Sequence, residues 1–419
     1  MRKWGILAVM MLVVLLAGCT AAWQQGEVVV VQEDQVTIHI LAGQSTSDAG
    51  SEELIDRVLR EKFPEVDFHW TCVDWGDGFG PQMTSKFAAG QMPDILIGKA
   101  QDVPVYQALG ALAPLDKAAC AEIDPNALEL TTVDGEIYGL PYNVLYQGVL
   151  YNKDIFEELG LSVPETRQEL EQVVAACEAA GYTAFGLHFG DVWSVGNLSM
   201  QLWMNDLFLQ YPSWADGVHA KQTGFSQEVL VADAFRQCQY MLSHSYADAV
   251  QIGQSECIKR FSQWESAMFM TGTWSLQDLS HLNPELAVGI FPYPNTTGDA
   301  RLLEETNLTF MKGSRGENEE LVDRILLEIG TNLELAQEIA EFTSANSTFL
   351  SLGNADTTFV ERLGAPYEAA DRIANVSLGN NQFVWSFQNA VADRTLFWLA
   401  GKTSLDQLLR YADEAFYMY

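Results

Sequence analysis

Short apolar runs typical of strands alternate with longer amphipathic runs between Val36 and Ile97. The strand-like runs are residues 36–41, 66–70 and 93–97, and the helical runs between them are residues 52–63 and about 82–89. This β-α-β-α-β order predicts an α/β sheet with crossover helices. Ligands of such sheets bind beyond the carboxyl ends of the strands, so the turns at 43–48 and 98–102 are candidate ligand turns.

The N-terminus has the pattern of a secretory signal. Arg2 and Lys3 precede an apolar stretch over residues 5–17 that is too short to span a bilayer. It ends in Leu16-Ala17-Gly18-Cys19, which resembles the bacterial lipobox. We expect residues 1–18 to be removed and Cys19 to carry a lipid that includes palmitate; the alternative is an ordinary buried cysteine. Residues 19–35 are then the anchor and tether.

Charge and cysteine content exclude several classes of protein. The chain has 23 Lys and Arg against 56 Asp and Glu, a net charge of −33, which disfavours nucleic acid as a partner. The cysteines after Cys19 are odd in number, so at least one is expected to be a free, buried thiol, and their pairing stays open. They are Cys72, Cys120, Cys177, Cys238 and Cys257. No Cys/His cluster has metal-ligand spacing, and no cofactor is expected.

Several motifs follow one another in a familiar order. They lie at residues 90–95, 112–116, 134–142, 150–156 with Gly160, 164–166 with Glu169, 265–274 and 291–294. Together the chain resembles the extracellular solute-binding proteins of bacterial ABC sugar importers (family 1, maltose-binding-protein-like). The resemblance implies a lipid-anchored, monomeric receptor outside the cell membrane that binds a carbohydrate and delivers it to the transmembrane permease subunits, which a separate cytoplasmic ATPase drives.

The resemblance also implies an α/β, two-lobed periplasmic-binding-protein-like fold with discontinuous domains and a ligand cleft between the lobes. One lobe is expected to take residues 36–142 with 303–343, and the other residues 144–302 with 344–419. Helical spacing of apolar residues over 317–343, around Gly330, agrees with this division. Closure of the lobes around the ligand is then the functional event.

Aromatic side chains are the first candidates for ligand contacts, since a sugar ring stacks its C–H face on an aromatic plate. Trp274 follows Gly272 after an apolar strand, and the matching family tryptophan stacks on sugar; the alternative is a core tryptophan that caps the strand. Trp385 lies near the place of another family aromatic, although its spacing to Gly401 is not a clean match. Trp75 lies in a glycine-rich stretch that we interpret as a turn near the cleft.

The expected crossover between the lobes carries a second group of candidates. Tyr142, Asn143 and Tyr146 lie where the family commonly contacts ligand, with core packing or a turn amide as the alternatives. Maltose-type relatives have an acidic residue where this chain has Leu145, which argues against maltodextrin as the ligand.

Polar residues beside predicted strand ends form a third group. Gln44 and Ser45 could bind sugar hydroxyls or cap the following helix, and Lys99 and Gln101 are ligand contacts or solvated loop. Asp191 and Trp193 follow a predicted strand as a hydroxyl acceptor and a plate, with helix capping and core packing as equal alternatives. Asp94 is expected to be structural.

Enzymatic activity is not expected. The chain lacks GxSxG, HExxH, P-loop and triad signatures, although a glycosidase carboxylate pair has no such signature. His39 and His69 lie inside predicted strands, where buried core histidines are usual. A neutral disaccharide or oligosaccharide fits best, because amino-acid binders need a cation and only Lys99 lies near the expected turns. A polyamine, a glycerol-phosphate ester or a charged sugar is the alternative.

Overall fold

A computed structural model of the chain describes most of it from Val36 onward. The described residues are 36–44, 51–74, 79–306, 308–314, 316, 318–343, 345–352, 372–374, 383 and 385–418. The expected signal peptide, Cys19, the tether, Ser45 and Trp75 lie outside them. Within these residues, no helix has both the length and the apolar character needed to cross a membrane.

The first sheet confirms the strands expected at the start of the chain. Its order is β2-β1-β3-β13-β4, with β7 paired to β13, and β1 runs parallel to both β2 and β3. The strands are β1 (Val36–Gln44), β2 (Val66–Asp74), β3 (Ile95–Gly98), β4 (Leu112–Ala113), β7 (Gly139–Pro141) and β13 (Thr309–Gly313). A small hairpin, β5 (Thr132–Val133) with β6 (Glu136–Ile137), lies outside it.

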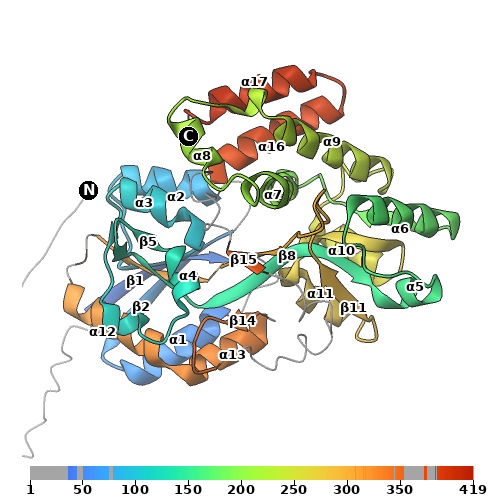
Figure 1. The fold of residues 1–419 in the computed structure, drawn as a ribbon. Helices are drawn as coiled ribbons and strands as arrows, with labels where there is room; N and C mark the ends of the chain where they lie inside the picture. The colour runs from blue at the N-terminus through green and yellow to red at the C-terminus, as the bar shows by residue number, and fades with distance from the viewer. Residues whose placement is uncertain are drawn as a thin grey trace, which may run out of the picture. The chain divides into compact units, whose positions relative to one another are not determined.

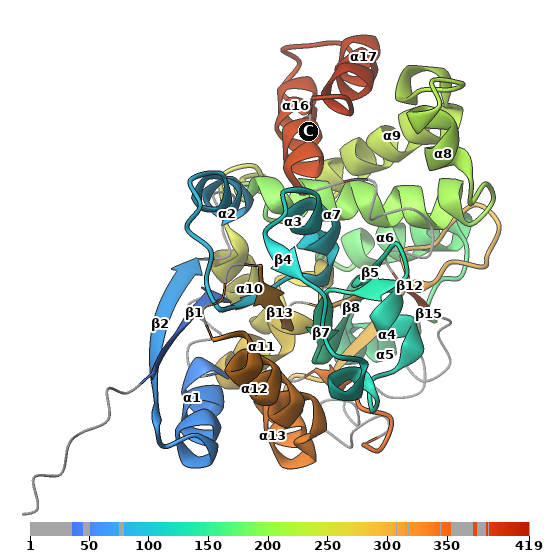
Figure 2. The same cartoon turned by 90° about the vertical axis from the view of Figure 1, so that its left-hand side faces the viewer.

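Helices cover both faces of this sheet (Figures 1 and 2). On one face, alternate strand residues such as Ile38 and Ile40 pack with Ile55, Ile325 and Leu335. These come from α1 (Ser51–Lys62), α12 (Glu319–Thr331) and α13 (Leu333–Thr343). The other face packs on α2 (Phe79–Ala88) and α3 (Val103–Ala108), which follows the short helix η1 (Ala100–Asp102). The sheet with these helices is called the first body; it also contains η2 (Lys117–Cys120) and α4 (Pro125–Glu129).

The second sheet is centred on the long strand β8 (Asn143–Asn152). Its order is β15-β12-β8-β10-β9, with β11 and β14 also paired to β8. These strands are β9 (Thr183–Gly186), β10 (Ser266–Gly272), β11 (Val288–Phe291), β12 (Leu302–Glu305), β14 (Asn346–Ser347) and β15 (Arg372–Ala374). Pairing with β8 is antiparallel for β10, β11 and β12.

The second sheet and its helices share one large core and are called the second body. Helices α7, α9, α16 and α17 lie together in both views (Figures 1 and 2). The helices are α5 (Lys153–Glu158), α6 (Arg167–Ala179), α7 (Val192–Trp203), the π-helical η3 (Met204–Phe208), α8 (Trp214–His219), η4 (Phe225–Gln227), α9 (Val229–Ser243), α10 (Gln254–Ser262), η5 (Thr273–Ser275), α11 (Leu276–Leu282), α16 (Trp385–Leu399) and α17 (Leu405–Ala415).

Three chain segments run side by side where the chain passes between the sheets. Tyr142 N–H donates to Leu308 O at 2.9 Å, and Asn346 pairs with Val144. The segment that contains Leu308 follows β12 of the second sheet. Leu303–Glu305 therefore belongs to the second sheet and not to the first lobe, which was expected to resume at residue 303. In the segment that begins at Asn346, Phe349 packs in the core of the first body and pairs with Ile123. Phe349 therefore belongs to the first body, although the second lobe was expected to resume at residue 344.

Two sequence expectations about side chains have different outcomes. Cys72, Cys120, Cys177, Cys238 and Cys257 are all free thiols and all but Cys72 are buried, which confirms the expected buried thiol. The expectation of core histidines at His39 and His69 is wrong, since both are exposed and their rings meet edge to face at 5.3 Å. They lie on the face of the first sheet that also carries buried Leu41, so the helices covering that face leave them uncovered.

Candidate functional site

Trp274 lies at the end of β10, where the strand turns into η5. Its indole is half-buried and covers the α-carbon of Gly272: a Cβ at position 272 would lie only 2.1 Å from a ring carbon. Gly272 is therefore the residue that lets the ring lie flat against the strand end. Trp193, in the first turn of α7, meets the Trp274 ring edge to face at 6.4 Å. Two of the four tryptophans expected to contact ligand are thus neighbours.

Gln147 and Glu305 lie next to this aromatic pair. Gly272 pairs with Gln147 of β8, and opposite residues of antiparallel strands present the same face of the sheet. Gln147 donates a hydrogen bond from Nε2 to Glu305 Oε2, from the end of β12. Gln147 Oε1 is buried and has no hydrogen-bond partner within the described residues. Neither residue was a candidate from the sequence.

The turn after β3 reaches the same end of β12. Ala100 N–H donates to Thr306 O at 3.1 Å, which ties η1 to the residue after Glu305. Asp102 of η1 is buried, and burial raises its pKa to about 6, against the opposing charge of Lys99 and the Tyr106 hydroxyl 3.4 Å away. Lys99 and Gln101, the two candidates expected in this turn, are half-buried on either side of Ala100. The turn therefore belongs to the candidate site, and Asp102 is a further residue of it.

Asp191 connects the start of α7 to the start of α10. His188 Nδ1 lies 3.1 Å from Asp191 Oδ2, and Gln254 N–H donates to the same oxygen at 2.7 Å. Burial favours the neutral acid, but these hydrogen bonds hold the pKa of Asp191 below its ordinary value. The Asp191 side chain makes no capping hydrogen bond to α7, the helix that it precedes, so the alternative that it caps this helix is wrong. His188 is buried and packs edge-on against Trp193 at 5.0 Å, which positions that ring.

The crossover residues are held in internal contacts. Tyr142 is fully buried, packs on Phe310 and Phe349, and donates its hydroxyl to Ile329 O at 3.1 Å. This geometry corrects the expected ligand role of Tyr142 in favour of the core-packing alternative, because no part of the side chain is accessible.

Asn143 and Tyr146 are also buried but lie on the crossing strand itself. Asn143 Oδ1 accepts from Leu308 N–H at 3.1 Å, which joins two crossing segments rather than closing a turn. Tyr146 OH accepts from Asn346 Nδ2 at 3.0 Å, and Tyr146 N–H donates to Thr273 Oγ1, next to Trp274. Both residues therefore hold the crossover and η5 in place.

Two further candidates are placed only by their backbones. Gln44 is the last residue of β1 and pairs with Asp74. Trp385 is the first residue of α16. Their side chains, like Ser45 and Trp75, lie outside what the structure describes, so their expected ligand contacts stay predictions.

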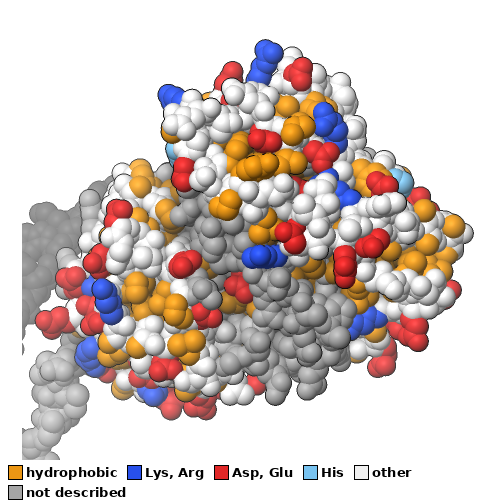
Figure 3. All heavy atoms as spheres, in the orientation of Figure 1, with side chains coloured by type: hydrophobic (Ala, Val, Ile, Leu, Met, Phe, Trp, Pro, Cys, Tyr) orange, Lys and Arg blue, Asp and Glu red, His pale blue; other side chains and the backbone are white. Residues whose placement is uncertain are grey.

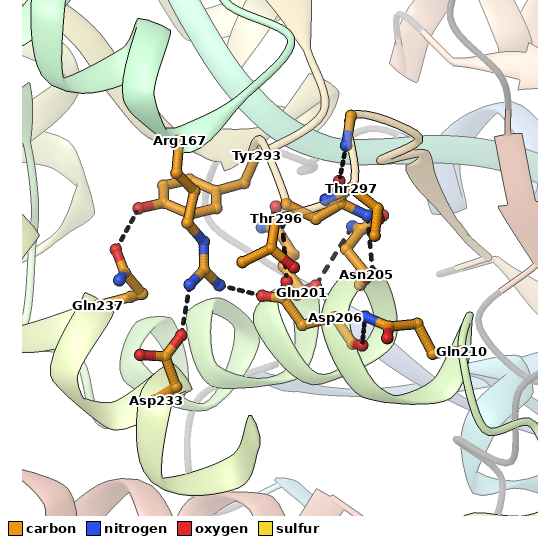
Figure 4. Close-up of polar contacts among 12 residues, drawn as sticks. Arg167, Gln201, Asn205, Asp206, Gln210, Asp233, Gln237, Tyr293, Thr296 and Thr297 are labelled. Carbon is orange, nitrogen blue, oxygen red and sulfur yellow. Dashed lines mark hydrogen bonds and ion pairs between the residues drawn. The ribbon is translucent and has the colours of Figure 1, made fainter. Parts of the chain in front are cut away.

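A second buried polar cluster lies in the same body (Figure 4). Arg167, at the start of α6, makes ion pairs through its two terminal nitrogens with Asp206 of η3 and Asp233 of α9. Burial raises the pKa of Asp206 despite the neighbouring guanidinium. Thr296 N–H donates to Asp206 at 3.3 Å, and Arg301 N–H donates to Asn205 Oδ1 at 2.6 Å. We call this the arginine cluster; it fastens the loop between β11 and β12 to η3.

A cavity lies in the first body, away from the residues around Trp274. It has a volume of about 590 Å³ and lies between α1 and the junction of α12 with α13, beside the ion pairs Arg57–Glu338 and Lys62–Glu328. None of its lining residues comes from the second body, so it is separate from the candidate site. Acidic side chains are spread over the face drawn in Figure 3, and no metal-binding group is found among the described residues.

Comparisons with known proteins agree on the family and the fold. The family model described as bacterial extracellular solute-binding protein matches residues 75–318. The multiple sugar-binding protein of Streptococcus mutans is 23% identical over 309 residues, which is 70% of each chain. The melibiose/raffinose/stachyose-binding protein of Bacillus subtilis is 23% identical over 304 residues, 70% of this chain and 68% of that protein. A chitin oligosaccharide binding protein superposes with a TM-score of 0.77 at 19% identity, covering 92% of this chain and 99% of that one. The structural likeness establishes a two-lobed α/β binding-protein fold.

Proposed function

Because the chain belongs to the bacterial extracellular solute-binding protein family, we propose that it is the receptor of an ABC importer and that it binds a carbohydrate, a disaccharide or oligosaccharide. The relatives named above, which bind several sugars or chitin oligosaccharide, support this ligand class. The receptor passes its ligand to the transmembrane permease subunits, and a separate ATPase drives transport. It acts by binding and closure, not by catalysis.

The Trp274 ring is the observation that carries the ligand proposal. It is half-buried, lies over Gly272 and is braced edge-on by Trp193, so one face of an aromatic plate is fixed in orientation. Beside it, Gln147 and Glu305 offer hydrogen-bond acceptors. A sugar ring needs this combination of an apolar plate and polar partners for its hydroxyls.

Lipid attachment completes the proposed location. The Leu16-Ala17-Gly18-Cys19 sequence supports processing before Cys19 and lipidation of its sulfur. The receptor is then a monomer anchored to the outer face of the cell membrane. Mass spectrometry of the membrane fraction tests this, since a Cys19→Ser variant would be released without lipid.

Thermal unfolding with tryptophan fluorescence tests the ligand class against a panel of mono- and oligosaccharides, amino acids, polyamines and glycerol phosphate. A sugar at a hundredfold over its dissociation constant adds about 2.7 kcal/mol to the free energy of unfolding. We expect a sugar to raise the midpoint and to be recovered chemically intact.

Two tryptophan variants locate the site. Trp274 and Trp264 lie beyond opposite ends of β10, so Trp274→Ala tests the plate and Trp264→Ala is the matched control. We expect the first variant to lose the sugar-induced shift and the second to keep it. A shift produced only by a non-sugar solute would overturn the carbohydrate proposal, and consumption of the sugar would identify an enzyme.

A further inference from the structure

Two buried carboxylates lie close enough to act on each other at the end of β12: Glu305 itself, and Asp102 in the turn whose Ala100 N–H donates to Thr306 O. Gln147, Glu305 and Asp102, here called the acceptor cluster, are 3%, 4% and 5% exposed. Neither Glu305 nor Asp102 forms an ion pair with a Lys or Arg among the described residues, although the charge of Lys99 acts on Asp102. A buried carboxylate is costly unless a cation or several hydrogen-bond donors compensate it.

An unpartnered amide oxygen points to a missing hydrogen-bond donor at this place. Gln147 uses Nε2 for Glu305, which fixes the orientation of its amide and leaves Oε1 on the same carbon, close to the carboxylate. Gln147 Oε1 and Thr306 Oγ1 are both buried without a partner in the described part of the chain. An acceptor-only amide oxygen beside a carboxylate needs a hydrogen-bond donor, and the described residues do not supply one.

The aromatic plate borders this cluster. Gly272, which the Trp274 ring covers, is the strand partner of Gln147, and their side-chain positions share one face of the sheet. On β12, Glu305 points to the same face as Leu303, and Glu304 points to the other. A ligand ring stacked on Trp274 therefore has its polar edge within reach of Gln147 and Glu305.

We propose that the acceptor cluster binds a protonated amino group of the sugar, so that the receptor's ligands are aminated saccharides. This inference rests on the proposed carbohydrate-binding function and names the ligand class. An ammonium group supplies three hydrogen-bond donors and a positive charge in direct contact, which neither carboxylate has among the described residues. A neutral hydroxyl supplies one donor and no charge, and an acidic sugar adds a third negative charge to the cluster.

Four ligands distinguish the effect of the positive charge from that of the sugar ring: the disaccharides cellobiose, the glucosamine dimer of the same linkage and its N-acetylated form, and the linear polyamine spermidine. Calorimetric titration of the purified protein at pH 6 gives each dissociation constant. We expect the glucosamine dimer to bind at least about tenfold more tightly than cellobiose. Equal or weaker binding of the glucosamine dimer, or none at all, overturns the proposal whichever other sugar binds.

Variants on β12 assign the preference to the cluster. Glu305→Gln removes the charge and keeps the shape, and we expect it to bring the two dimers within about threefold of each other. Glu304→Gln makes the same chemical change on the opposite face of the strand and should keep the full preference. A preference that survives Glu305→Gln with Asp102→Asn contradicts the assignment.

Failure of the general function has a different signature. Binding of spermidine alone, with no response to any saccharide, would refute the carbohydrate receptor but leave the affinity of the cluster for amines. Binding of cellobiose as tightly as the glucosamine dimer would refute the amine preference and leave the carbohydrate receptor standing.

Discussion

The arginine cluster is partly buried around a buried Asp206, and the acceptor cluster is fully buried; the two differ most in charge balance. In the arginine cluster, Arg167 lies between Asp206 and Asp233, and the backbone N–H of Thr296 also donates to Asp206. In the acceptor cluster, the partners of Glu305 and Asp102 among the described residues are an amide, a tyrosine hydroxyl and the charge of Lys99.

This difference separates a structural role from a binding role. A buried cation between two carboxylates completes its own interactions and fixes a loop, here the one between β11 and β12. Buried carboxylates that lack a counter-charge destabilise the ligand-free protein. Their presence next to an aromatic plate therefore favours a function in binding over a structural one. The comparison predicts opposite effects of removing charge in the two places.

Removal of Arg167 should have the largest effect on stability. Arg167→Met keeps most of the side-chain volume but leaves Asp206 buried without its partner, and we expect the free energy of unfolding to fall by about 3–5 kcal/mol. Urea titration followed by circular dichroism measures it. The exposed pair Arg57–Glu338 is the control, and Arg57→Met should cost less than about 1 kcal/mol. Similar losses in the two variants would contradict the contrast between the clusters.

Removal of the Asp102 charge should stabilise the protein at neutral pH. The folded-state pKa of Asp102, about 6, lies above the ordinary value of about 3.9, so its contribution is fully present below pH 4 and is lost as the pH rises through 6. This shift in pKa corresponds to a loss of about 3 kcal/mol in the free energy of unfolding between low and neutral pH. The free energy of unfolding of Asp102→Asn, relative to that of the wild type, should therefore increase between pH 4 and pH 7, whereas that of Glu304→Gln should not. Parallel stability–pH curves for the wild type and Asp102→Asn would show that burial does not perturb this carboxyl.

Much of the fold could be predicted from sequence because strand and helix periodicities are local. Strands β1, β2 and β3 and helices α12 and α13 lie where the apolar spacing predicts them. Pairing over long range has no such signal: Leu302–Glu305 has the pattern of any strand, and only its register with β8 assigns it to the second sheet.

The candidate site was predicted in part. Trp274 and Trp193 were expected and are neighbours, whereas the burial of Tyr142 depends on Phe310 and Phe349, which come from distant parts of the chain. Gln147 was missed, although a glutamine within the apolar run of β8 is a usable signal.

Gly272→Ala tests whether Trp274 lies against the acceptor cluster. The added methyl group would meet the ring at 2.1 Å, so the indole must leave its position, at a cost of about 1–3 kcal/mol in the free energy of unfolding. We expect sugar binding to weaken at least about tenfold, measured by tryptophan fluorescence. Gly196→Ala in α7 is the control, because its nearest neighbour is 3.6 Å away and alanine favours the helix.

Combining Gly272→Ala with Trp274→Ala separates the plate from the strand. If the methyl group acts only by displacing the ring, the double variant recovers the stability of Trp274→Ala and gains no affinity. Normal binding by Gly272→Ala would mean that the ligand does not use the ring in this position. The amine preference would then rest on the acceptor cluster without the ring, since Gln147 stays bonded to Glu305.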